Sequence, residues 1–516
     1  MSSVLDEVVD AVEPAPDILS VMAAAKRAFL LSLDVGTSGV RASLFDDQGN
    51  EIDGAQVSNY RRTLTSFSDL GSLDADSLVA QVFESIDDLM SSAAGSYARI
   101  QAIAISCFWH SLMGVDADGN PTTPLLTWAD TRAAVAAKDL AKRFDELEIH
   151  NRTGCRFHPS YWPVKLEWLR AERPNIYNNT KYWLGFSEYL CKQLFSTTST
   201  SISMASATGL FDQHKCDWDW SFIKILALPE HSLPEIASEN ERPQLKDELA
   251  ERWPALGEAR LYTVLGDGAA NNLGSGCCTK HQVALMVGTS GAMRVVYDGE
   301  PPLTLPSSLW SYRVDRSRVV VGGALSDGGG LYRWLTELMV IGGDPAELER
   351  RLDTLEPDSH GLTILPFWSG ERSTGWSPDA RGAILGLTQQ TQPIEILRAA
   401  LEAIAYRFAL IDEALSSLNG QTTVVATGNA LRSSRVWLQI MADVLGRRVM
   451  YGGSPESSTR GAALLALEAM GKIENIAESS ISVDEVFDPD MTRHARYREG
   501  LARQEKFYCR LMSDKL

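Results

Sequence analysis

The sequence has few cysteines and no long apolar run. Its seven cysteines are scattered over 516 residues, and none forms a CxxC pair. This pattern argues against a disulfide framework or a zinc site and favours unpaired thiols in a reducing, cytoplasmic compartment. No segment has the ~18 consecutive apolar residues of a transmembrane helix, so no membrane span is expected.

Positive charge is also scarce. The chain carries 48 basic and 67 acidic residues, which gives a formal net charge of -19. Proteins that bind nucleic acids or membrane surfaces use clustered Lys and Arg, so neither partner is expected. The acidic surface favours solubility, and an anionic substrate would have to be bound by local donors.

The sequence contains no GxxxxGK[ST] motif, which excludes a P-loop as a phosphate site. A different glycine-rich element is present twice: Val-Gly-Thr-Ser-Gly occurs at Val35–Gly39 and at Val287–Gly291. Each copy lies between two strand-like segments. Glycine permits a tight turn, and the exposed N–H groups and hydroxyls of such a turn form a concave anion site. Two such loops facing one cleft would suit a polyphosphate.

The organisation of the chain indicates an α/β protein with more than one domain. A chain of 516 residues is too long for a single core. Strand-like and helical segments alternate, and a new strand pattern begins near Thr279–Gln282. We therefore predict domains at residues 29–280 and 281–516. Residues 1–28 are acidic and lack the basic start of a signal peptide, so we expect an N-terminal extension there.

Several segments have sharp helix or strand signals. Pro393 and Asn419-Gly420 bound a long apolar-periodic run, and either Ser433 or Ser434 caps a second one that Gly446 ends. The predicted strands are Phe29–Leu33, Val40–Phe45, Ile103–Cys107, Val283–Met286, Ala292–Tyr297, Val319–Val321 and Val424–Thr427, and the predicted helices include Asp74–Ser92, Ile394–Leu418 and Arg435–Leu445.

Two aspartates adjoin these glycine-rich turns. Asp267 lies between two glycines after an apolar segment, and Asp34 ends the strand before the first loop. A carboxylate at the floor of a cleft can accept a proton from an attacking hydroxyl. Gly-Asp-Gly also fits an ordinary turn, and Asp34 could simply hydrogen-bond its own loop. The residues alone leave these alternatives open.

Taken together, several motifs resemble those of the FGGY carbohydrate kinases, a family of the actin-like ATPase superfamily. The resemblance extends from about Phe29 to the C-terminus. The motifs, in the family's order, are Asp34–Gly39, Gly266-Asp267-Gly268, Gly288–Gly291, and Gly382–Leu387 followed by Glu395 and Ala399–Glu402. The resemblance implies two actin-like (ribonuclease H-like) ATPase domains flanking a catalytic cleft, with ATP and Mg²⁺ as cofactors.

The resemblance also implies roles for individual residues. Asp267 would be the catalytic base, and Asp34 and Asp267 would hold Mg²⁺, in part through water. The residues implied in nucleotide binding are Gly36, Thr37, Ser38, Gly39, Gly288, Thr289, Ser290, Gly328, Gly428, Asn429 and Ala430. Most family members carry glycine where this chain has Asn429. Arg372 also resembles a family element near the nucleotide or the hinge.

Two loops are candidates for the acceptor site. Trp109 and His110 follow a predicted strand where family members hold the sugar, and a Trp face packs well on a sugar's C–H surface. A lone His is more often structural. Asp130 and Arg132 lie in the second loop; they could pair with each other, but an Arg fork also suits a carboxylate.

The sequence also indicates which sugar is the acceptor. Four stretches resemble the gluconate kinases of the family: His110-Ser111, Thr127–Arg132, Arg152–Pro159 and Ala205–Leu210. Trp162 departs from the family signature, which has a small residue or proline there. We expect phosphorylation of D-gluconate to 6-phosphogluconate. A xylulose or other pentulose kinase is the alternative, and an actin-like ATPase scaffold without sugar kinase activity is a remote one. The sequence is compatible with a homodimer.

Overall fold

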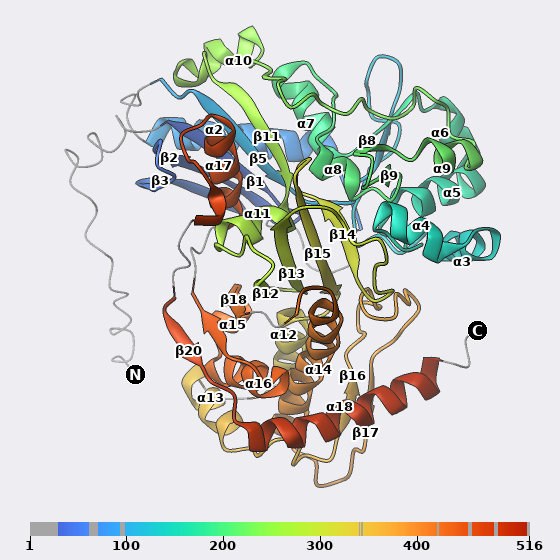
Figure 1. The fold of residues 1–516 in the computed structure, drawn as a ribbon, viewed down its shortest axis with the longest axis vertical. Coiled ribbons are helices and arrows are strands. Elements are labelled where there is room, and N and C mark those ends of the chain that lie inside the picture. The colour runs from blue at the N-terminus through green and yellow to red at the C-terminus, as the bar shows by residue number, and fades with distance from the viewer. Residues whose placement is uncertain are drawn as a thin grey trace, which may run out of the picture.

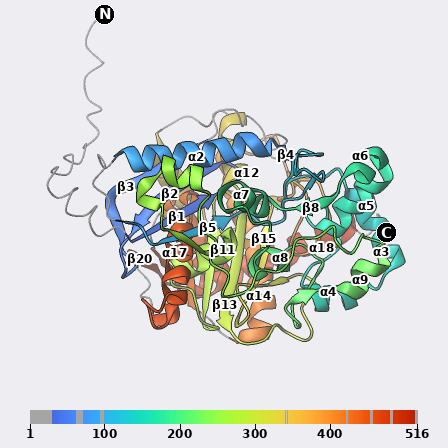
Figure 2. The same cartoon turned by 90° about the horizontal axis from the view of Figure 1, so that it is seen from above.

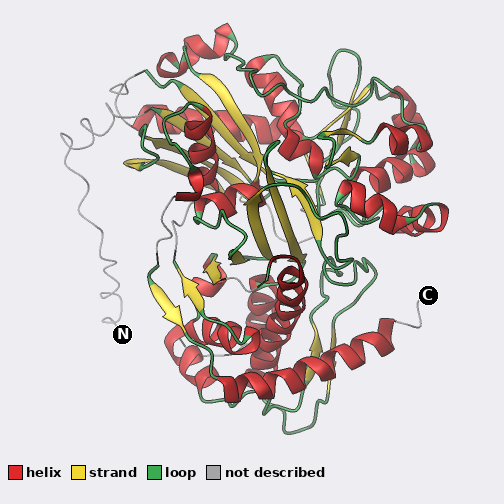
Figure 3. Cartoon of the chain, in the orientation of Figure 1, coloured by secondary structure: helices red, strands yellow, loops and turns green. Residues whose placement is uncertain are grey.

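The computed structural model describes residues 29–60, 71–92, 99–339, 341, 344–420, 423–452, 457–478 and 483–512. The predicted extension at residues 1–28 lies outside the described residues. The chain forms two α/β halves, each built on one large sheet with helices packed on it (Figures 1 and 3). The predicted α/β class is confirmed. No helix in the described ranges is long and apolar enough to cross a lipid bilayer.

The first sheet has the strand order β11-β5-β1-β2-β3. Strands β1 and β2 form an antiparallel hairpin, whereas β5 and β11 are parallel to β1. Every residue of β1 and β5 is buried, as expected for strands covered on both faces. The strands are β1 (Leu30–Val35), β2 (Gly39–Phe45), β3 (Glu51–Tyr60), β5 (Ala102–Cys107) and β11 (Arg260–Gly266).

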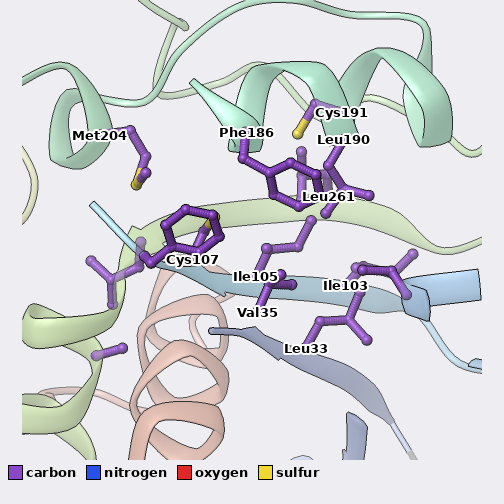
Figure 4. Packing of buried hydrophobic residues seen from close by; sticks show 14 of the residues in the cluster. Leu33, Val35, Ile103, Ile105, Cys107, Phe186, Leu190, Cys191, Met204 and Leu261 are labelled. Carbon is purple, nitrogen blue, oxygen red and sulfur yellow. The ribbon is translucent and has the colours of Figure 1, made fainter. Parts of the chain in front are cut away.

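Helices cover both faces of this sheet. Helix α2 (Ala75–Ser92) and helix α7 (Phe186–Phe195) lie on one side, and α17 (Ser457–Ala469) lies on the other (Figure 2). Helix α11 (Asp267–Gly274) packs against α17. Phe186 and Leu190 of α7 pack over Ile103 and Ile105 of β5 in the core (Figure 4).

The second sheet repeats the arrangement of the first. Its order is β14-β15-β13-β12-β18-β19-β20, so the segment β19-β18-β12-β13-β15 has the pairing pattern of β11-β5-β1-β2-β3. The two Val-Gly-Thr-Ser-Gly copies therefore occupy the same hairpin turn in each sheet. The strands are β12 (Gln282–Val287), β13 (Gly291–Asp298), β14 (Trp310–Arg313), β15 (Arg318–Leu325), β18 (Thr423–Thr427), β19 (Val449–Tyr451) and β20 (Glu485–Phe487).

The helices of the second half form where the sequence signals predict them. Helix α14 (Pro393–Asn419) begins with a proline and a capping box from Glu395. Helix α16 (Arg435–Leu445) is capped by Ser434 and ends at Gly446, which has a φ of 63°. The other helices here are α12 (Gly329–Leu338), α13 (Pro345–Asp353), α15 (Asn429–Arg432) and α18 (Met491–Met512).

One helix from the end of the chain lies on the first sheet. Helix α17, red in Figure 1, packs beside the blue strands and buries Ala462, Ala463 and Ala466 against them. It also meets α11 backbone to backbone. A Cβ at Gly274 would lie 1.7 Å from the Ser457 carbonyl oxygen. Within the segment predicted as the second domain, this helix thus belongs structurally to the first sheet.

The remaining elements form a lobe beside the first sheet and short pairs at the edges. The lobe's helices are α3 (Ala134–Arg143), α4 (Glu146–Thr153), α5 (Trp162–Glu172), α6 (Pro174–Asn179), α8 (Ile202–Ser206) and α9 (Trp220–Ile225). Helix α10 (Asp247–Arg252) packs on the core of the first sheet, and the 3-10 turns in the described residues are η2 (Pro254–Leu256) and η3 (Ile476–Glu478). The short strands are β4 (Ser72–Leu73), β6 (Met113–Val115), β7 (Leu125–Leu126), β8 (Tyr182–Leu184), β9 (Phe211–Asp212), β10 (Asp217–Trp218), β16 (Thr363–Leu365) and β17 (Ala383–Leu385).

Candidate active site

A cleft of about 1000 Å³ lies between the two halves, and both glycine-rich repeats line it. Most of the site residues predicted from the sequence meet there. They are Asp34, Gly36, Thr37, Ser38, Trp109, His110, Asp267, Gly288, Thr289, Ser290, Gly428, Asn429 and Ala430. Segments more than 390 positions apart in the sequence thus share one cavity.

Each repeat forms a tight turn between two strands. The Gly36 N–H donates to the Gly39 carbonyl at 2.9 Å, and the Gly288 N–H donates to the Ser290 carbonyl at 2.9 Å. Gly39 does not line the cleft; a Cβ there would lie 2.6 Å from the Asn59 carbonyl oxygen, so its role is packing against β3.

Gly328, another residue predicted to bind the nucleotide, supports the second turn from behind. Its N–H donates to the Thr289 carbonyl at 3.1 Å, and a Cβ there would lie 2.7 Å from the Ser290 carbonyl oxygen. Gly328 does not line the cleft itself. It therefore contacts the second glycine-rich turn rather than the cavity.

Asp34 ends β1 at the edge of the cleft. Its Oδ1 accepts a hydrogen bond from the Ser106 hydroxyl at 2.7 Å, and its Oδ2 pairs with Arg41 at 3.1 Å. Burial raises the pKa of Asp34, although the charge of Arg41 and the Ser106 hydrogen bond lower it.

Asp267 is the first residue of α11, directly after β11. Its Oδ1 accepts the Gly268 N–H at 2.7 Å, which leaves Oδ2 for a ligand. Burial raises the pKa of Asp267 to about 6, while the charge of Arg294 lowers it and the nearby Asp34 raises it further. A carboxylate with such a pKa is ionised at neutral pH but can still accept a proton efficiently.

The glycines beside Asp267 make room for Trp109. A Cβ on Gly266 would lie 1.8 Å from the indole, and one on Gly268 would lie 2.5 Å from it. The indole Nε1 donates to the Ser203 carbonyl at 3.1 Å, and the Ser203 hydroxyl accepts the Gly266 N–H at 3.1 Å. Trp109 is thus fixed against the backbone on both sides of Asp267.

His110 is held in an uncommon backbone conformation, with a φ of 67°. Its Nδ1 lies 2.8 Å from the Ala207 carbonyl oxygen. A carbonyl can only accept, so Nδ1 carries the proton and Nε2 is left as an acceptor. Burial holds the pKa of His110 well below its usual range, and the charge of Arg372 lowers it further. The imidazole is therefore neutral at physiological pH.

Helix α5 anchors the turn that contains His110. The Lys165 ammonium donates to the His110 carbonyl at 2.6 Å and to the Ser160 carbonyl at 2.9 Å. One helical turn earlier, the Trp162 indole donates to the Ser111 carbonyl at 2.8 Å. The departure from the family signature at Trp162 thus supplies a second hydrogen bond to this turn.

Asp130 and Arg132 do not line this cleft. They pair with each other through Arg132 Nε to Asp130 Oδ1 at 3.0 Å and Arg132 Nη2 to Asp130 Oδ2 at 2.5 Å. Both residues line a separate pocket of about 610 Å³. Of the two alternatives that the sequence left open for this loop, the mutual ion pair is the one observed, while its Trp128 reaches the main cleft.

The comparisons with known proteins identify the family. Residues 29–274 match the N-terminal domain of the FGGY family of carbohydrate kinases, and residues 283–470 match its C-terminal domain. The chain belongs to this family. The resemblance inferred from the motifs is confirmed, and the protein is a sugar kinase. Family membership implies ATP as the phosphoryl donor and a small sugar as the acceptor.

The most similar proteins include kinases for several acceptors. The gluconokinase of Bacillus subtilis is 29% identical over 461 residues, covering 87% of this chain and 88% of that protein. The glycerol kinase of Gloeobacter violaceus is 30% identical, covering 89% and 92%. Among solved structures, the gluconate kinase of Lactobacillus acidophilus has a TM-score of 0.83 at 27% identity, covering 93% of this chain and 98% of that one. The xylulose kinase of the same organism has a TM-score of 0.83 at 28% identity, covering 94% and 98%.

The cleft of this kinase also contains residues that the sequence analysis did not place there. Trp310 and Tyr312 of β14, Arg294 of β13 and Asn271 of α11 all line it. The Tyr312 hydroxyl lies 2.7 Å from the Tyr161 hydroxyl, and the Trp310 and Tyr312 rings stack with centroids 4.4 Å apart. The alternation Trp-Ser-Tyr was the available signal, but nothing in the sequence indicated that β14 reaches the other half.

The nucleotide end of the cleft fits an adenosine and its phosphates. Gly428 has a φ of 99°, and a Cβ there would lie 2.4 Å from the Val287 carbonyl oxygen. A Cβ at Gly329 would lie 2.6 Å from the Ala430 Cβ. The Thr427 hydroxyl oxygen is buried and, among the described residues, has no hydrogen-bond partner. A bound nucleotide would fill the space that these glycines leave open, and it would give the Thr427 hydroxyl a hydrogen-bond partner.

The residues around Asp267 also fit a magnesium ion. Asp34 and Asp267 are close enough for the charge of one to raise the pKa of the other. The Asn271 amide oxygen, one turn along α11, is buried and finds no hydrogen-bond partner within the described part of the chain. Two carboxylates and an amide oxygen match the hard oxygen ligands that Mg²⁺ prefers.

Proposed function

We propose that the protein transfers the γ-phosphate of ATP to the primary hydroxyl of a sugar acid, converting D-gluconate to 6-phosphogluconate with Mg²⁺. Gluconokinases are among its relatives, at 29% and 28% identity. The local motifs around His110-Ser111 and Ala205–Leu210 support the same acceptor, since they resemble gluconate kinases. The buried guanidinium of Arg294, which lines the cleft, also suits an acceptor with a negative charge.

The observation that carries this proposal is the position of Asp267. Its carboxylate lies in the same cleft as Trp109, His110 and the two glycine-rich repeats. A base must be within reach of the hydroxyl whose proton it takes, and that hydroxyl must face the γ-phosphate. Asp267 Oδ2 is assigned to take this proton as the oxygen attacks phosphorus.

The acceptor would be held by aromatic and hydrogen-bonding groups. The Trp109 face packs against C–H groups of the acceptor, and His110 Nε2 accepts a hydrogen bond from one of its hydroxyls. His110 is neutral, and its ring is fixed by the hydrogen bond to Ala207. The hydrogen bond to His110 Nε2 therefore orients the acceptor but does not select for its charge. The acceptor is thereby aligned with its primary hydroxyl toward Asp267.

The phosphates would be held by the two repeats. Backbone N–H groups and hydroxyls at Gly36–Ser38 and Gly288–Ser290 donate to the phosphate oxygens. Asp34 and Asp267, with Asn271 nearby, would hold Mg²⁺ directly or through water. When bound, that ion neutralises charge on the β- and γ-phosphates.

A second acceptor class is favoured by one comparison. The xylulose kinase of Lactobacillus acidophilus is as similar in fold as the gluconate kinase, with the same TM-score of 0.83. A pentulose is uncharged, so it would leave the buried Arg294 guanidinium without an ion-paired partner.

A coupled ADP-release assay over gluconate, xylulose, ribulose and glycerol tests the proposal. We expect the highest kcat/KM with gluconate, and 6-phosphogluconate as the product by mass spectrometry. Turnover of a pentulose with gluconate inert would replace the proposed function by the alternative. If the protein binds ATP normally but turns over neither gluconate nor a pentulose, the proposed function and its alternative are both contradicted.

A further inference from the structure

Arg294 is a buried cation at the floor of the cleft. It lies on β13, is 4% exposed, and its Nη1 donates to the Gly268 carbonyl at 2.7 Å. Across the described ranges, no carboxylate forms an ion pair with its guanidinium. The charge of Asp267 favours the cation at longer range, but a buried guanidinium without a directly paired anion is costly unless a ligand completes the pair. Burial accordingly lowers the pKa of Arg294 to about 10, while Asp267 raises it and Arg372 lowers it further.

A second donor without an acceptor lies close to Arg294 in the same sheet. Trp310 is 3% exposed, and its indole Nε1 has no hydrogen-bond partner among the residues that the structure describes. In the sheet register, Gly322 of β15 pairs with Arg294 on one side and with Trp310 on the other. A Cβ at Gly322 would lie 2.7 Å from Arg294 Cγ. The missing side chain therefore leaves room for the arginine beside the indole.

Arg294 and Trp310 lie near Trp109, at the end of the cleft that we assign to the acceptor rather than to the nucleotide. Arg294 contacts Gly268, against which the Trp109 indole packs. The Trp310 ring lies 6.0 Å from the Trp109 ring, centroid to centroid. A ligand group that satisfies both an unpaired guanidinium and an indole N–H must present acceptors and a negative charge. A carboxylate meets both requirements and matches the guanidinium fork.

We propose that Arg294, with Trp310 Nε1 as a second donor, binds the carboxylate of the acceptor and thereby selects sugar acids over uncharged sugars. This inference rests on the proposed function, because it names the residues that recognise the acid of that substrate. The local cation also explains how a chain with a net charge of -19 can bind an anionic acceptor.

The test compares D-gluconate with D-glucitol, in which a hydroxymethyl group replaces the carboxylate. The variants are Arg294→Met, Arg294→Lys and Trp310→Phe. We expect Arg294→Met to raise KM for gluconate about 100-fold and to lower the gluconate-to-glucitol ratio of kcat/KM by a similar factor. Arg294→Lys should lie between wild type and Arg294→Met, and Trp310→Phe should lower the ratio about 10-fold. KM for ATP should change less than about twofold in each.

Arg333→Met is the matched control, because Arg333 is an exposed cleft arginine on α12 at the nucleotide end. It should leave the acceptor ratio unchanged whatever it does to ATP. Loss of the Arg294 charge also changes the pKa of Asp267, but that change applies to both acceptors and cancels in the ratio. Calorimetric titration of each acceptor with a non-hydrolysable ATP analogue present gives the same comparison when turnover of glucitol is too slow to measure.

The possible outcomes separate this inference from the proposed function. If wild type phosphorylates gluconate and Arg294→Met leaves the ratio and the gluconate affinity unchanged, the inference is wrong and the proposed function stands. Equal losses for both acceptors, or a change confined to KM for ATP, would also overturn it. If wild type phosphorylates xylulose and no sugar acid, the proposed function itself fails.

Discussion

The indole of Trp109 occupies the space in which a side chain at Gly266 would begin. A Cβ on Gly266 would lie 1.8 Å from both Cε2 and Nε1 of the ring. The glycine is therefore required by a tryptophan 157 positions earlier, not by a turn, since Gly266 has an ordinary extended conformation with a φ of -68°. The contact fixes the Trp109 ring and the start of the helix that carries Asp267 relative to each other.

Gly266→Ala is expected to disturb both partners of this contact. The added methyl group overlaps the indole, and overpacking of this kind costs about 1–3 kcal/mol of folding free energy. We expect a lower melting temperature and a KM for the acceptor raised at least about 10-fold. Thermal unfolding and steady-state kinetics measure the two effects.

Gly257→Ala provides the control, because a Cβ there meets its nearest neighbour at 3.4 Å, an ordinary contact. It should leave the melting temperature and KM near wild type. If Gly266→Ala behaves in the same way as Gly257→Ala, Trp109 does not depend on the missing side chain.

Asp267→Asn tests the assignment of the base. The amide keeps the size of the side chain but cannot take a proton, so kcat should fall about 10²–10⁴-fold. ATP binding, measured by calorimetry, should stay within a few-fold of wild type. Asp139→Asn, on the exposed surface of α3, is the matched control and should retain full turnover. Retained turnover in Asp267→Asn would remove this residue from the chemical step.

The pH profile should report the same carboxylate. Burial raises the pKa of Asp267 to about 6, with Arg294 opposing the shift and Asp34 adding to it. The base acts when deprotonated, so kcat/KM should fall as pH drops through about 6, about tenfold per pH unit below it. Removing the positive charge in Arg294→Met should move this limb to higher pH. His110 stays neutral across this range because burial holds its pKa well below the usual value.

Rates measured from about pH 5 to about pH 8 distinguish the outcomes. A limb near the ordinary carboxylate range, about pH 4, would mean that solvent or the charge of bound Mg²⁺ lowers the Asp267 pKa in the working enzyme. If the acidic side of the pH profile has the same midpoint in Arg294→Met as in wild type, the charges of Arg294 and Asp267 do not interact.

Lys165 is expected to be a positioning residue for the acceptor site. Its buried ammonium holds the carbonyls of His110 and Ser160, so Lys165→Met leaves two acceptors without a donor. Each unsatisfied buried group costs about 1–3 kcal/mol, and the melting temperature should fall. Because the His110 turn is then less constrained, KM for the acceptor should rise about 10-fold while KM for ATP stays constant.

Lys142→Met is the control for that variant. Lys142 is exposed and pairs only with Asp139 one turn away on α3 in the described structure, and such surface pairs contribute little. It should match wild type in both measurements. Equal changes in both KM values for Lys165→Met would indicate general destabilisation rather than a role at the acceptor.

Much of the fold was predictable from short signals in the sequence. The hydrophobic runs, Pro393, Ser434 and Gly446 placed helices α14 and α16 within a residue of their observed bounds. The two Val-Gly-Thr-Ser-Gly copies were correctly expected at strand turns, because a glycine-rich turn between apolar runs is specified by its own residues. The return of α17 to the first sheet was not predictable in this way, since its sequence is equally compatible with either sheet.

Some of the site residues predicted from the sequence lie in the cleft, and others do not. Asp34, Asp267, Trp109 and His110 were identified from motifs, and they do line one cleft. Asp130 and Arg132 were grouped with them because an Arg fork suits a carboxylate, but their mutual ion pair lies outside that cleft. Residue type indicates what a side chain can bind, and only its surroundings decide whether a neighbour already satisfies it.

The sequence by itself determined the kinase family, the alternating α/β elements and the two glycine-rich loops, because each depends on residues close together in the chain. Only the tertiary structure decided which buried groups lack an ion pair or a hydrogen-bond acceptor. Arg294 and Trp310 face the acceptor end because β13, β15 and β14 align on either side of Gly322, and that register depends on pairing between separate segments. The buried cation that we assign to acceptor recognition is therefore a property of the folded sheet.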